Sequence, residues 1–501
     1  MQEKKRRTSL NTSPNEEIED SGIQLKAIWT EGDWTLSSTT ALRQWENQQT
    51  DADTDYVPAD LFRLFDHSDI DTLSQEFTLL WQPDDQLQLL TGLYLATEDY
   101  SGGRNLEGAG DADNFLISLL NPTFTPAPCL PPIETSGCVV PTGIGALLPN
   151  GSITQEKYQQ DSDSYALYSH LSWDINTELQ LVGGLRYSVE DKSGSVDIRY
   201  WYDSPISPLL TAIGGFPNDG TPRNGLDIIG VEYSPPFDKS IKDEEVTGSL
   251  ALNYRLSDDI MAYTSYSRGF KAGGINLFRE AVLTDTTHYD PEYADSYEIG
   301  LKSQYWQGRA SSNIALFYTE FSDLQVNFFD GLNFRTENTG KARTQGVELE
   351  NTLLFTEQWT MDFAVTYLEA TFESLDNPQL DYLLDRDTPR APDWASVLGI
   401  NFNQQLSANL KIKARASLSY TGDHYVGADV VGEEKQDEYL ISDLSISLQD
   451  QADSWAVTLW CKNCDNQDYR TIYFNSAFQE GSNNAYLNAP RQYGATFSMK
   501  F

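Results

Sequence analysis

The four histidines are the first side chains to weigh for chemistry, because an imidazole can act as a general base or bind a metal ion. His67, His170, His288 and His424 are scattered over 501 residues, and three of them fall in predicted loops. A Ser/His/Asp site would need one of them beside a nucleophilic serine. His170 falls on the polar face of its predicted strand, where a solvated side chain is the simpler interpretation. We therefore expect no enzyme.

The four cysteines form two closely spaced pairs. Cys129 and Cys138 close a short proline-rich segment, which in an exported protein predicts a loop disulfide. Cys461 and Cys464 have the spacing of a redox or zinc pair, but no second such pair and no pair of histidines lies nearby. The sequence therefore predicts neither a metal site nor a bound cofactor.

Acidic residues outnumber basic ones by 75 to 34, which gives a formal net charge of −41. This balance excludes a nucleic-acid-binding protein, which would need a basic face for the phosphates. Two predicted loops are especially acidic, and they either attract a cationic ligand or Ca²⁺ or are simply solvated faces of an acidic protein, the reading that we favour. Their acidic residues are Asp51, Asp53, Asp55 and Asp60 in one loop and Glu433, Glu434, Asp437 and Glu438 in the other.

Aromatic side chains in predicted loops are candidates to grip a hydrophobic or aromatic ligand, although loop packing would use the same residues. They are Tyr56, Phe62, Phe65, Tyr200, Trp201, Tyr202, Phe328 and Phe329. Arg268 and Lys271, at the outer end of one predicted strand, either face an anionic chelate or pair with acidic loop neighbours. Gly273 and Gly274 follow them, and no helix begins there to cradle a phosphate. The two glycines therefore indicate a change from strand to loop.

The elements that must carry these residues show alternation of apolar and polar side chains with a period of two. At the end of the chain, apolar residues alternate with Gln492, Gly494, Thr496, Ser498 and Lys500; they are Tyr493, Ala495, Phe497, Met499 and Phe501. Such segments run about 9 to 14 residues, which is the length that a tilted strand needs to cross a bilayer. Because lipid cannot satisfy an open sheet edge, only a closed barrel crosses in this way.

Short and long connections alternate strictly, as they do in outer-membrane barrels with short periplasmic turns and long extracellular loops. The short turns are predicted at 31–33, 83–85, 176–178, 257–259, 307–308, 356–358, 407–409 and 452–454. The long loops are predicted at 47–72, 99–160, 192–243, 271–291, 324–342, 373–392, 422–437 and 466–489. A soluble repeat or sandwich is the alternative, but loops of this length at one end only are rare there.

Eight hairpins and a last strand make about 17 strands, whereas single-chain bacterial barrels have even strand numbers. The first predicted strand, 22–30, descends, so residues 1–21 are expected to be the remnant of an extracellular loop, with the barrel over 22–501. Five further strands upstream would give a probable total of 22. No apolar run of helical membrane length is present, mean hydropathy is −0.47, and the basic start has no apolar segment behind it to form a signal peptide.

Several stretches resemble the TonB-dependent receptor family of outer-membrane proteins. Residues 267–276 are similar to its Gly-Phe-Lys-x-Gly-Gly loop entry, and 289–302 to its Pro-Glu and Tyr-Glu-x-Gly-x-Lys passage. The Gly-Val-Glu strand at 338–350, the Asn-Leu-x-Asp-x-x-Tyr turn at 463–469 and the last strand from Pro490 also match. Each motif is weak alone, but their order and their places at strand ends agree with the family over roughly residues 22–501.

The resemblance implies a monomeric receptor that takes up a scarce bulky nutrient, most often a ferric siderophore, with cobalamin and saccharides as other family substrates. Loops and barrel wall would capture the ferric chelate, while TonB pulls on a plug domain to open a path. A passive porin-type diffusion barrel is the alternative, and an outer-membrane enzyme is a second one. Outer-membrane lipid and lipopolysaccharide surround such a barrel, and nucleic acid is not a partner.

The chain departs from the family's pattern in two respects. The family places a signal peptide, a TonB box and a plug domain before the barrel, and none of them is present, so a fragment, a misplaced start or a split gene is expected. Cys464 stands where the family usually has an aliphatic residue. A Cys461–Cys464 disulfide in the turn would replace that packing contact, although regular strand geometry would direct the two side chains to opposite faces.

The alternating last strand resembles the signal that the barrel-assembly machinery reads. Tyr493, Phe497 and the terminal Phe501 carry that resemblance. It implies that Phe501 is required for assembly into the outer membrane.

Overall fold

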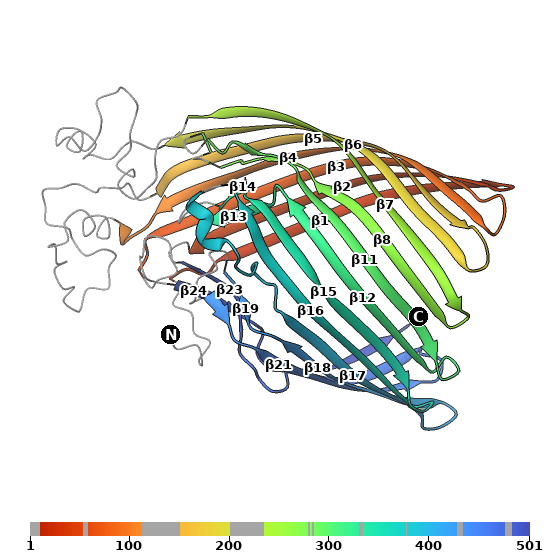
Figure 1. Cartoon of the computed structure of the whole chain (residues 1–501). Helices are drawn as coiled ribbons and strands as arrows, with labels where there is room; N and C mark the ends of the chain where they lie inside the picture. The colour runs from red at the N-terminus through yellow and green to blue at the C-terminus, as the bar shows by residue number, and fades with distance from the viewer. Residues whose placement is uncertain are drawn as a thin grey trace, which may run out of the picture.

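The computed structural model describes residues 11–53, 59–112, 151–200, 235–278, 281–282, 285–329, 334–376, 378–427, 434–475 and 483–500. Within these ranges the chain forms one antiparallel sheet of 17 long strands, which curves around a central space (Figure 1). Among the described elements, the 3-10 helix Pro378–Leu383 lies outside the sheet. None of the helical residues in the described ranges forms a segment that is long and apolar enough to cross a membrane.

The long strands follow one another up and down in chain order. They are β1 (Asn15–Glu31), β2 (Trp34–Asp53), β3 (Phe62–Trp81), β4 (Leu87–Gly108), β5 (Gly151–Asp174), β6 (Leu179–Tyr200), β7 (Phe237–Ser257), β8 (Ile260–Lys271), β11 (Glu292–Tyr305), β12 (Ala310–Ser322), β15 (Gly340–Leu354), β16 (Trp359–Leu375), β17 (Trp394–Gln405), β18 (Leu410–Thr421), β21 (Tyr439–Asp450), β22 (Trp455–Lys462) and β25 (Gln492–Met499).

In the described parts of the connections between the long strands lie four short two-stranded sheets. They pair β9 (Gly274–Ile275) with β10 (His288–Tyr289), β13 (Gln325–Phe329) with β14 (Phe334–Asn338), β19 (His424–Tyr425) with β20 (Lys435–Gln436), and β23 (Arg470–Asn475) with β24 (Asn483–Leu487).

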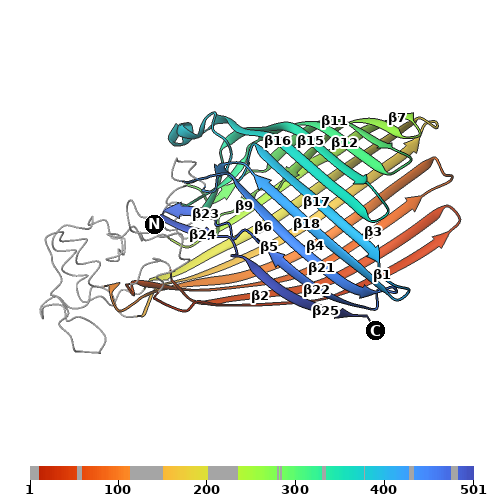
Figure 2. The ribbon, with the colours of Figure 1, turned by 90° about the horizontal axis from the view of Figure 1, so that it is seen from below.

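Each long strand pairs with the next one along the chain, and the predicted strand count of about 17 is confirmed. In the described part of the chain, β1 pairs with β2 alone and β25 with β22 alone, so these two strands are the edges of the sheet. The sheet rolls between them, as the view from below shows (Figure 2).

The eight short turns lie together at one end of the sheet, which we call the turn end (Figure 1). They occupy 32–33, 82–86, 175–178, 258–259, 306–309, 355–358, 406–409 and 451–454, so all eight predicted turns are confirmed. Several use a left-handed backbone, with φ of +57° at Gly32 and +76° at Gly308. Glycine reaches such angles without steric cost, which lets the chain reverse within a few residues.

The strands extend further into the predicted loops than the sequence suggested. The segments 47–72, 99–160 and 192–243 were expected to be loops, but β2 continues to Asp53, β4 to Gly108 and β6 to Tyr200. The first strand likewise begins at Asn15 rather than at 22. The hydrophobic period is lost where both faces of a strand are polar, although the backbone ladder continues, so periodicity alone ended these strands too early.

Aromatic side chains mark two levels on the outward face of the sheet. Eight residues separate Trp173 from Tyr165 on β5, Tyr305 from Tyr297 on β11, and Trp359 from Tyr367 on β16. Eight residues span about 27 Å along a strand, or roughly 20 Å along the barrel axis at a tilt of about 40°. We call the band between the two levels the apolar belt.

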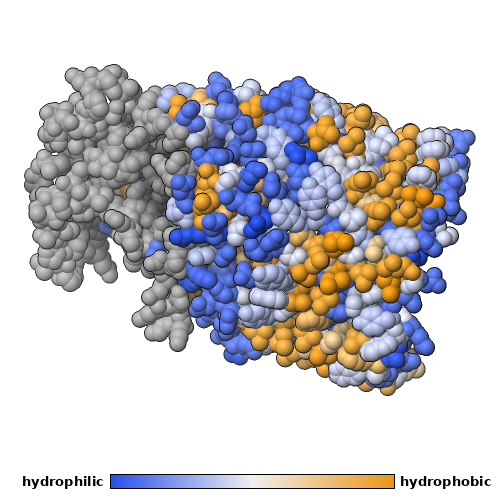
Figure 3. Space-filling model, in the orientation of Figure 1, coloured by the Kyte–Doolittle hydropathy of each residue, from blue (hydrophilic) through white to orange (hydrophobic). Residues whose placement is uncertain are grey.

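Large apolar side chains in this belt are exposed rather than buried, as Leu167 (58%) and Leu250 (55%) illustrate. Hydrophobic residues gather over the half of the wall nearest the turns, and hydrophilic residues follow toward the opposite, loop end (Figure 3). An exposed apolar band of this height between two aromatic levels is the surface that a bilayer covers. The buried clusters lie instead near the loop end, around Phe372 and Leu383 and around Tyr158 and Val196.

Candidate ligand-binding site

Arg268 and Lys271 lie three residues apart near the end of β8, and an odd offset along a strand places two side chains on opposite faces. Arg268 faces outward, where its Nη1 lies 2.8 Å from Asp295 Oδ2 and its guanidinium 5.0 Å from the Tyr293 ring. Lys271 is therefore placed on the inner face, opposite Glu292 in the register, and it is exposed. Of the two cations, Lys271 is the one that the fold directs to the central space.

The aromatic ligand-contact candidates occupy two places at the loop end. Tyr200 is the last residue of β6, and Phe328 and Phe329 belong to β13. Trp201 and Tyr202 lie outside the described residues. Phe62 and Phe65 are in β3, and Phe62 is almost completely buried, so it packs the wall instead of presenting a surface to a ligand.

The connection after β8 turns back against the wall because two glycines permit close approach. The Gly273 N–H donates to Asp243 Oδ2 at 2.8 Å, and its carbonyl accepts from Lys192 Nζ at 2.8 Å. A Cβ at Gly274 would lie 2.1 Å from the Tyr289 hydroxyl. Burial raises the pKa of the Asp243 carboxyl. The glycine pair thus fixes the start of this loop against β6 and β7.

Amide side chains join this loop to the connection between β12 and β15. Asn276 donates to the carbonyls of Thr286 and Thr336, at 2.6 and 2.9 Å, and accepts from the Thr336 N–H. Gln325 donates to the carbonyls of Ala272 and Asp290. Buried backbone groups need such partners, so these amides hold the loops as one unit.

The inner wall carries a cation between two aromatic rings. The Arg186 guanidinium on β6 lies 5.8 Å from the Tyr94 ring and 5.6 Å from the Tyr168 ring, and its Nε donates to Ser188 Oγ at 2.9 Å. Tyr168 in turn donates to Glu76 Oε1 at 2.7 Å. A guanidinium held in this way favours anionic or planar groups that pass along the wall.

A second polar cluster lies nearer the loop end of the same face. Asp66, Arg104 and Glu156 are direct neighbours on β3, β4 and β5, and Arg104 Nη2 lies 3.0 Å from Asp66. Tyr158 donates to Glu156, and both side chains are almost completely buried. Burial, and then the adjacent Glu156 carboxylate, hold the pKa of Tyr158 well above its usual value. This network braces the extended strands, and its residues line a polar hollow of about 620 Å³ on the inner face.

The histidines do not come together in the structure. His67 is on β3 and covers Gly103, His170 is on β5, His288 is in β10, and His424 Nδ1 lies 2.8 Å from the Gly422 carbonyl. Among the residues that the structure describes, no group of three or more His, Cys, Asp or Glu side chains is placed to hold a metal ion.

Cys461 and Cys464 are joined by a disulfide, with 5.7 Å between their Cα atoms. The disulfide can form because regular strand geometry ends before Cys464: β22 ends at Lys462, and Asn463 has a left-handed φ of +48°. The two side chains are therefore no longer directed to opposite faces. Cys129 and Cys138 lie outside the described residues.

Two of the three residues of the predicted assembly signal lie on the last strand. Tyr493 and Phe497 face outward on β25 and are 80% and 64% exposed. Phe501 lies outside the described residues.

Arg186 was not among the residues that the sequence singled out as candidates, because its surroundings come from other strands. Tyr94 and Tyr168 reach it from β4 and β5 through the sheet register, which no local spacing encodes. The one available signal was the scarcity of basic residues, since each inward cation in so acidic a chain is a candidate for function.

A family model described as the TonB-dependent receptor-like β-barrel matches residues 5–464. The pesticin receptor of Yersinia pestis is 26% identical over 322 residues, which cover 63% of this chain and 41% of that receptor. The ferric-pyoverdine 358 receptor of Pseudomonas putida is 22% identical over 314 residues, or 58% of this chain and 36% of the receptor. The chain thus spans about two fifths of the length of these curated relatives.

Solved structures share the fold over almost the whole chain. The ferric yersiniabactin uptake receptor FyuA from Yersinia pestis has a TM-score of 0.72 at 18% identity, over 97% of this chain and 62% of that one. The siderophore receptor PiuA from Acinetobacter baumannii has a TM-score of 0.64 at 16% identity, over 97% of this chain and 64% of that one. At these identities the likeness establishes the fold.

Proposed function

Because the chain belongs to the TonB-dependent receptor family, whose β-barrel model spans residues 5–464, we propose that it forms the wall of a receptor for a scarce, bulky nutrient, a ferric siderophore first of all. The family is one of receptors and transporters, and its place is the bacterial outer membrane. The similarity to the pesticin and ferric-pyoverdine receptors is the observation that carries the choice of ligand class.

The wall contributes positioning and no covalent chemistry in this proposal. Loops at the loop end capture the ferric chelate, and the inner wall guides it, with Lys271 and Arg186 as the cations for an anionic ligand. The aromatic candidates Tyr200, Trp201, Tyr202, Phe328 and Phe329 supply apolar contacts to the ligand in this proposal. TonB acts on a plug domain within the barrel, while the barrel-assembly machinery inserts the strands among lipid and lipopolysaccharide.

Uptake measurements test the proposal directly. The gene is deleted, and growth on ferric catecholate, hydroxamate and citrate is compared under iron limitation, in cells with and without TonB. The proposal expects loss of growth on one ferric chelate, with the same loss when TonB is absent. Uptake that persists without TonB, together with entry of unrelated small solutes, would favour the passive porin instead.

A pair of matched variants tests the inner-wall assignment. Lys271→Glu should lower uptake of an anionic ferric chelate about tenfold, the equivalent of one lost charge-assisted hydrogen bond. Arg268→Gln, three residues away on the outer face, should leave uptake unchanged because its partner is Asp295. Equal losses in both variants would show that the two faces are assigned wrongly.

A further inference from the structure

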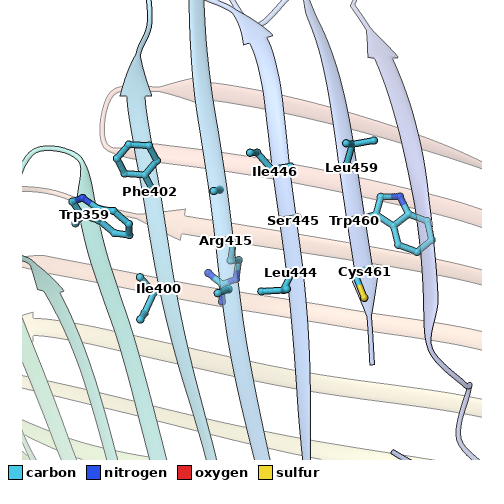
Figure 4. Close-up of a pocket in the computed structure, with 12 residues that line it drawn as sticks. Trp359, Ile400, Phe402, Arg415, Leu444, Ser445, Ile446, Leu459, Trp460 and Cys461 are labelled. Atoms are coloured by element: carbon cyan, nitrogen blue, oxygen red, sulfur yellow. The ribbon is translucent and has the colours of Figure 1, made fainter. Parts of the chain in front are cut away.

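The outward face of the wall contains an apolar hollow of about 480 Å³ over β17, β18, β21 and β22 (Figure 4). Its floor is formed where the outward side chains of β18 become small, at Ala414 and Ala416, between Ile412 and Leu418. The hollow lies at the turn-end level of the apolar belt.

Two rows of side chains across the sheet enclose the floor. Trp359 and Phe402 lie beside Ala414 in one row, which continues to Ile446 and Leu459. Ile400, Leu444 and Cys461 flank Ala416 in the second row. The rows are two residues apart, about 7 Å along the strands. Figure 4 shows Phe402, Ile446 and Leu459 in one line and Ile400, Leu444 and Cys461 in the next.

The Arg415 and Trp460 side chains line the hollow, but their polar groups bond to residues outside it. Arg415 donates to Asn401 at 2.8 Å and lies 3.6 Å from Asp362, both on the inner face. Trp460 donates through its indole N–H to Thr496 at 3.1 Å. A protein interface usually carries about one hydrogen bond per 100–200 Å². This hollow lacks such groups among its described lining residues, so its chemistry suits hydrocarbon.

The hollow begins beside an aromatic pair at the membrane boundary. The Trp359 and Phe402 rings lie 4.6 Å apart, next to the turns at 355–358 and 406–409. Amphipathic rings at this level mark where lipid headgroups meet the hydrocarbon. Short turns of outer-membrane barrels face the periplasm, so the hollow opens to the inner, phospholipid leaflet.

We propose that this hollow is a binding site for one acyl chain of a periplasmic-leaflet phospholipid, held against Ala414 and Ala416. An apolar depression in the wall does not hold water, and unfilled space there forfeits dispersion contacts on one side. The hollow is continuous with the apolar belt, which lipid covers, so an acyl chain is the molecule available to fill it. The bound chain fills the gap between Phe402 and Ile446 and presents a smooth surface to the surrounding lipid.

Photocrosslinking tests the proposal with the full chain in its native membrane. The probe is phosphatidylethanolamine with a diazirine midway along one acyl chain, and crosslinked peptides are mapped by mass spectrometry. We expect labelling of residues 394–418 and 439–462 several-fold above that of β7 and β11, which carry Leu250, Leu252, Tyr297 and Ile299 outward over the same belt. The double variant Ala414→Leu/Ala416→Leu fills the hollow and should reduce this labelling to the level of those strands.

Two further variants keep the result interpretable. Ala27→Leu, on the exposed face of β1, adds the same bulk away from the hollow and should change nothing. Ile446→Ala widens the hollow and should increase labelling, which provides a second test if the double variant fails to give the heat-modifiable folded form. Even labelling around the wall, labelling that survives filling, or protection of these residues by a bound protein would overturn the proposal.

Discussion

At the scale of single residues, glycines decide where strands can approach one another. Gly340 has a φ of +112°, and a Cβ there would lie 2.3 Å from the Ser374 carbonyl oxygen. The register of β15 and β16 shifts immediately after it, between Lys341 and Ala342. Gly340 thus permits both the positive φ and the shift in register between β15 and β16, at the point where the loop joins the wall.

Gly340→Ala should therefore destabilise the barrel by about 1–3 kcal/mol, since it combines an unfavourable φ with a backbone clash. The temperature at which the heat-modifiable form unfolds on a gel measures the loss. Gly269→Ala is the control, because a Cβ there meets nothing within 4 Å and its φ is not positive. Equal unfolding temperatures for both variants would contradict this account.

A second residue-scale feature is the ion pair between Lys435 and Asp423 at the loop end. The hydrogen bond from the Lys435 ammonium lowers the pKa of the Asp423 carboxyl from its usual value. A carboxyl with a depressed folded-state pKa contributes stability above its unfolded pKa and loses it as pH falls through the folded value.

Asp423→Asn should ease local opening of the β19–β20 pair by about 0.2–1 kcal/mol near neutral pH, the range for exposed pairs. Because the pair is lost on protonation, the difference from the parent should shrink as pH falls below about 4. Amide hydrogen exchange, corrected for its intrinsic pH dependence, measures it, with Asp437→Asn as control. A difference that stays constant down to low pH would argue against the pair.

At the scale of strands, three acidic residues lie directly opposite one another on neighbouring strands of the wall. Asp71 on β3 pairs in register with Asp99 on β4, and Asp99 pairs with Asp161 on β5. Directly opposed residues of an antiparallel sheet have Cβ atoms about 4.5–5.5 Å apart, where like charges are destabilising. Dissolved salt screens this repulsion, so the folded barrel should be more stable at higher salt concentration.

Asp99→Asn removes the central charge and should raise stability by about 0.5–1 kcal/mol at low salt. The gain should fall toward zero in about 0.5 M salt, where the screening length is only a few ångströms. Unfolding temperatures at two salt concentrations give the comparison, and Asp85→Asn in the turn 82–86 provides a control outside the row. A gain that is independent of salt would mean that the charge is not its cause.

The same scale shows what the sequence could and could not predict. All eight turns were predictable because polar turn residues interrupt clear apolar alternation, as at 257–259 and 407–409. The ends of β2 and β4 were not, because both faces are largely polar there and only the backbone ladder continues. In β6 the polar stretch 190–195 interrupts the alternation, which resumes at the buried Val196 and Ile198. The surroundings of Arg186 depend on lateral register between strands far apart in sequence, so they emerged only with the fold.

At the scale of the whole molecule, the outward period of two continues into the last strand. Tyr493 and Phe497 are presented to the outside of β25, which pairs with β22 alone among the described strands. A strand with one unpaired edge and exposed outward aromatics is accessible to the machinery that inserts barrels.

Deleting Phe501 should abolish assembly, because it removes the terminal aromatic of this alternating strand. The measurement is the amount of heat-modifiable barrel in the outer-membrane fraction, and Phe501→Tyr, which keeps an aromatic ring, should restore it. Normal assembly of the deletion variant would refute the assigned role of the last residue.

The strands differ greatly in length, and this gives the wall an uneven height. β5 has 24 residues and β22 has 8, or about 80 Å and 27 Å along the strand. The apolar belt takes up only about eight of them, so β2 to β6 rise far above the bilayer while β21 and β22 end close to its surface (Figure 2). The two sides of the mouth are therefore built differently, with continuous long strands on the side of β2 to β6 and the short sheets β19–β20 and β23–β24 beyond β18, β21 and β22. A molecule that approaches from the first side meets one unbroken sheet, and a molecule from the other side meets separate hairpins.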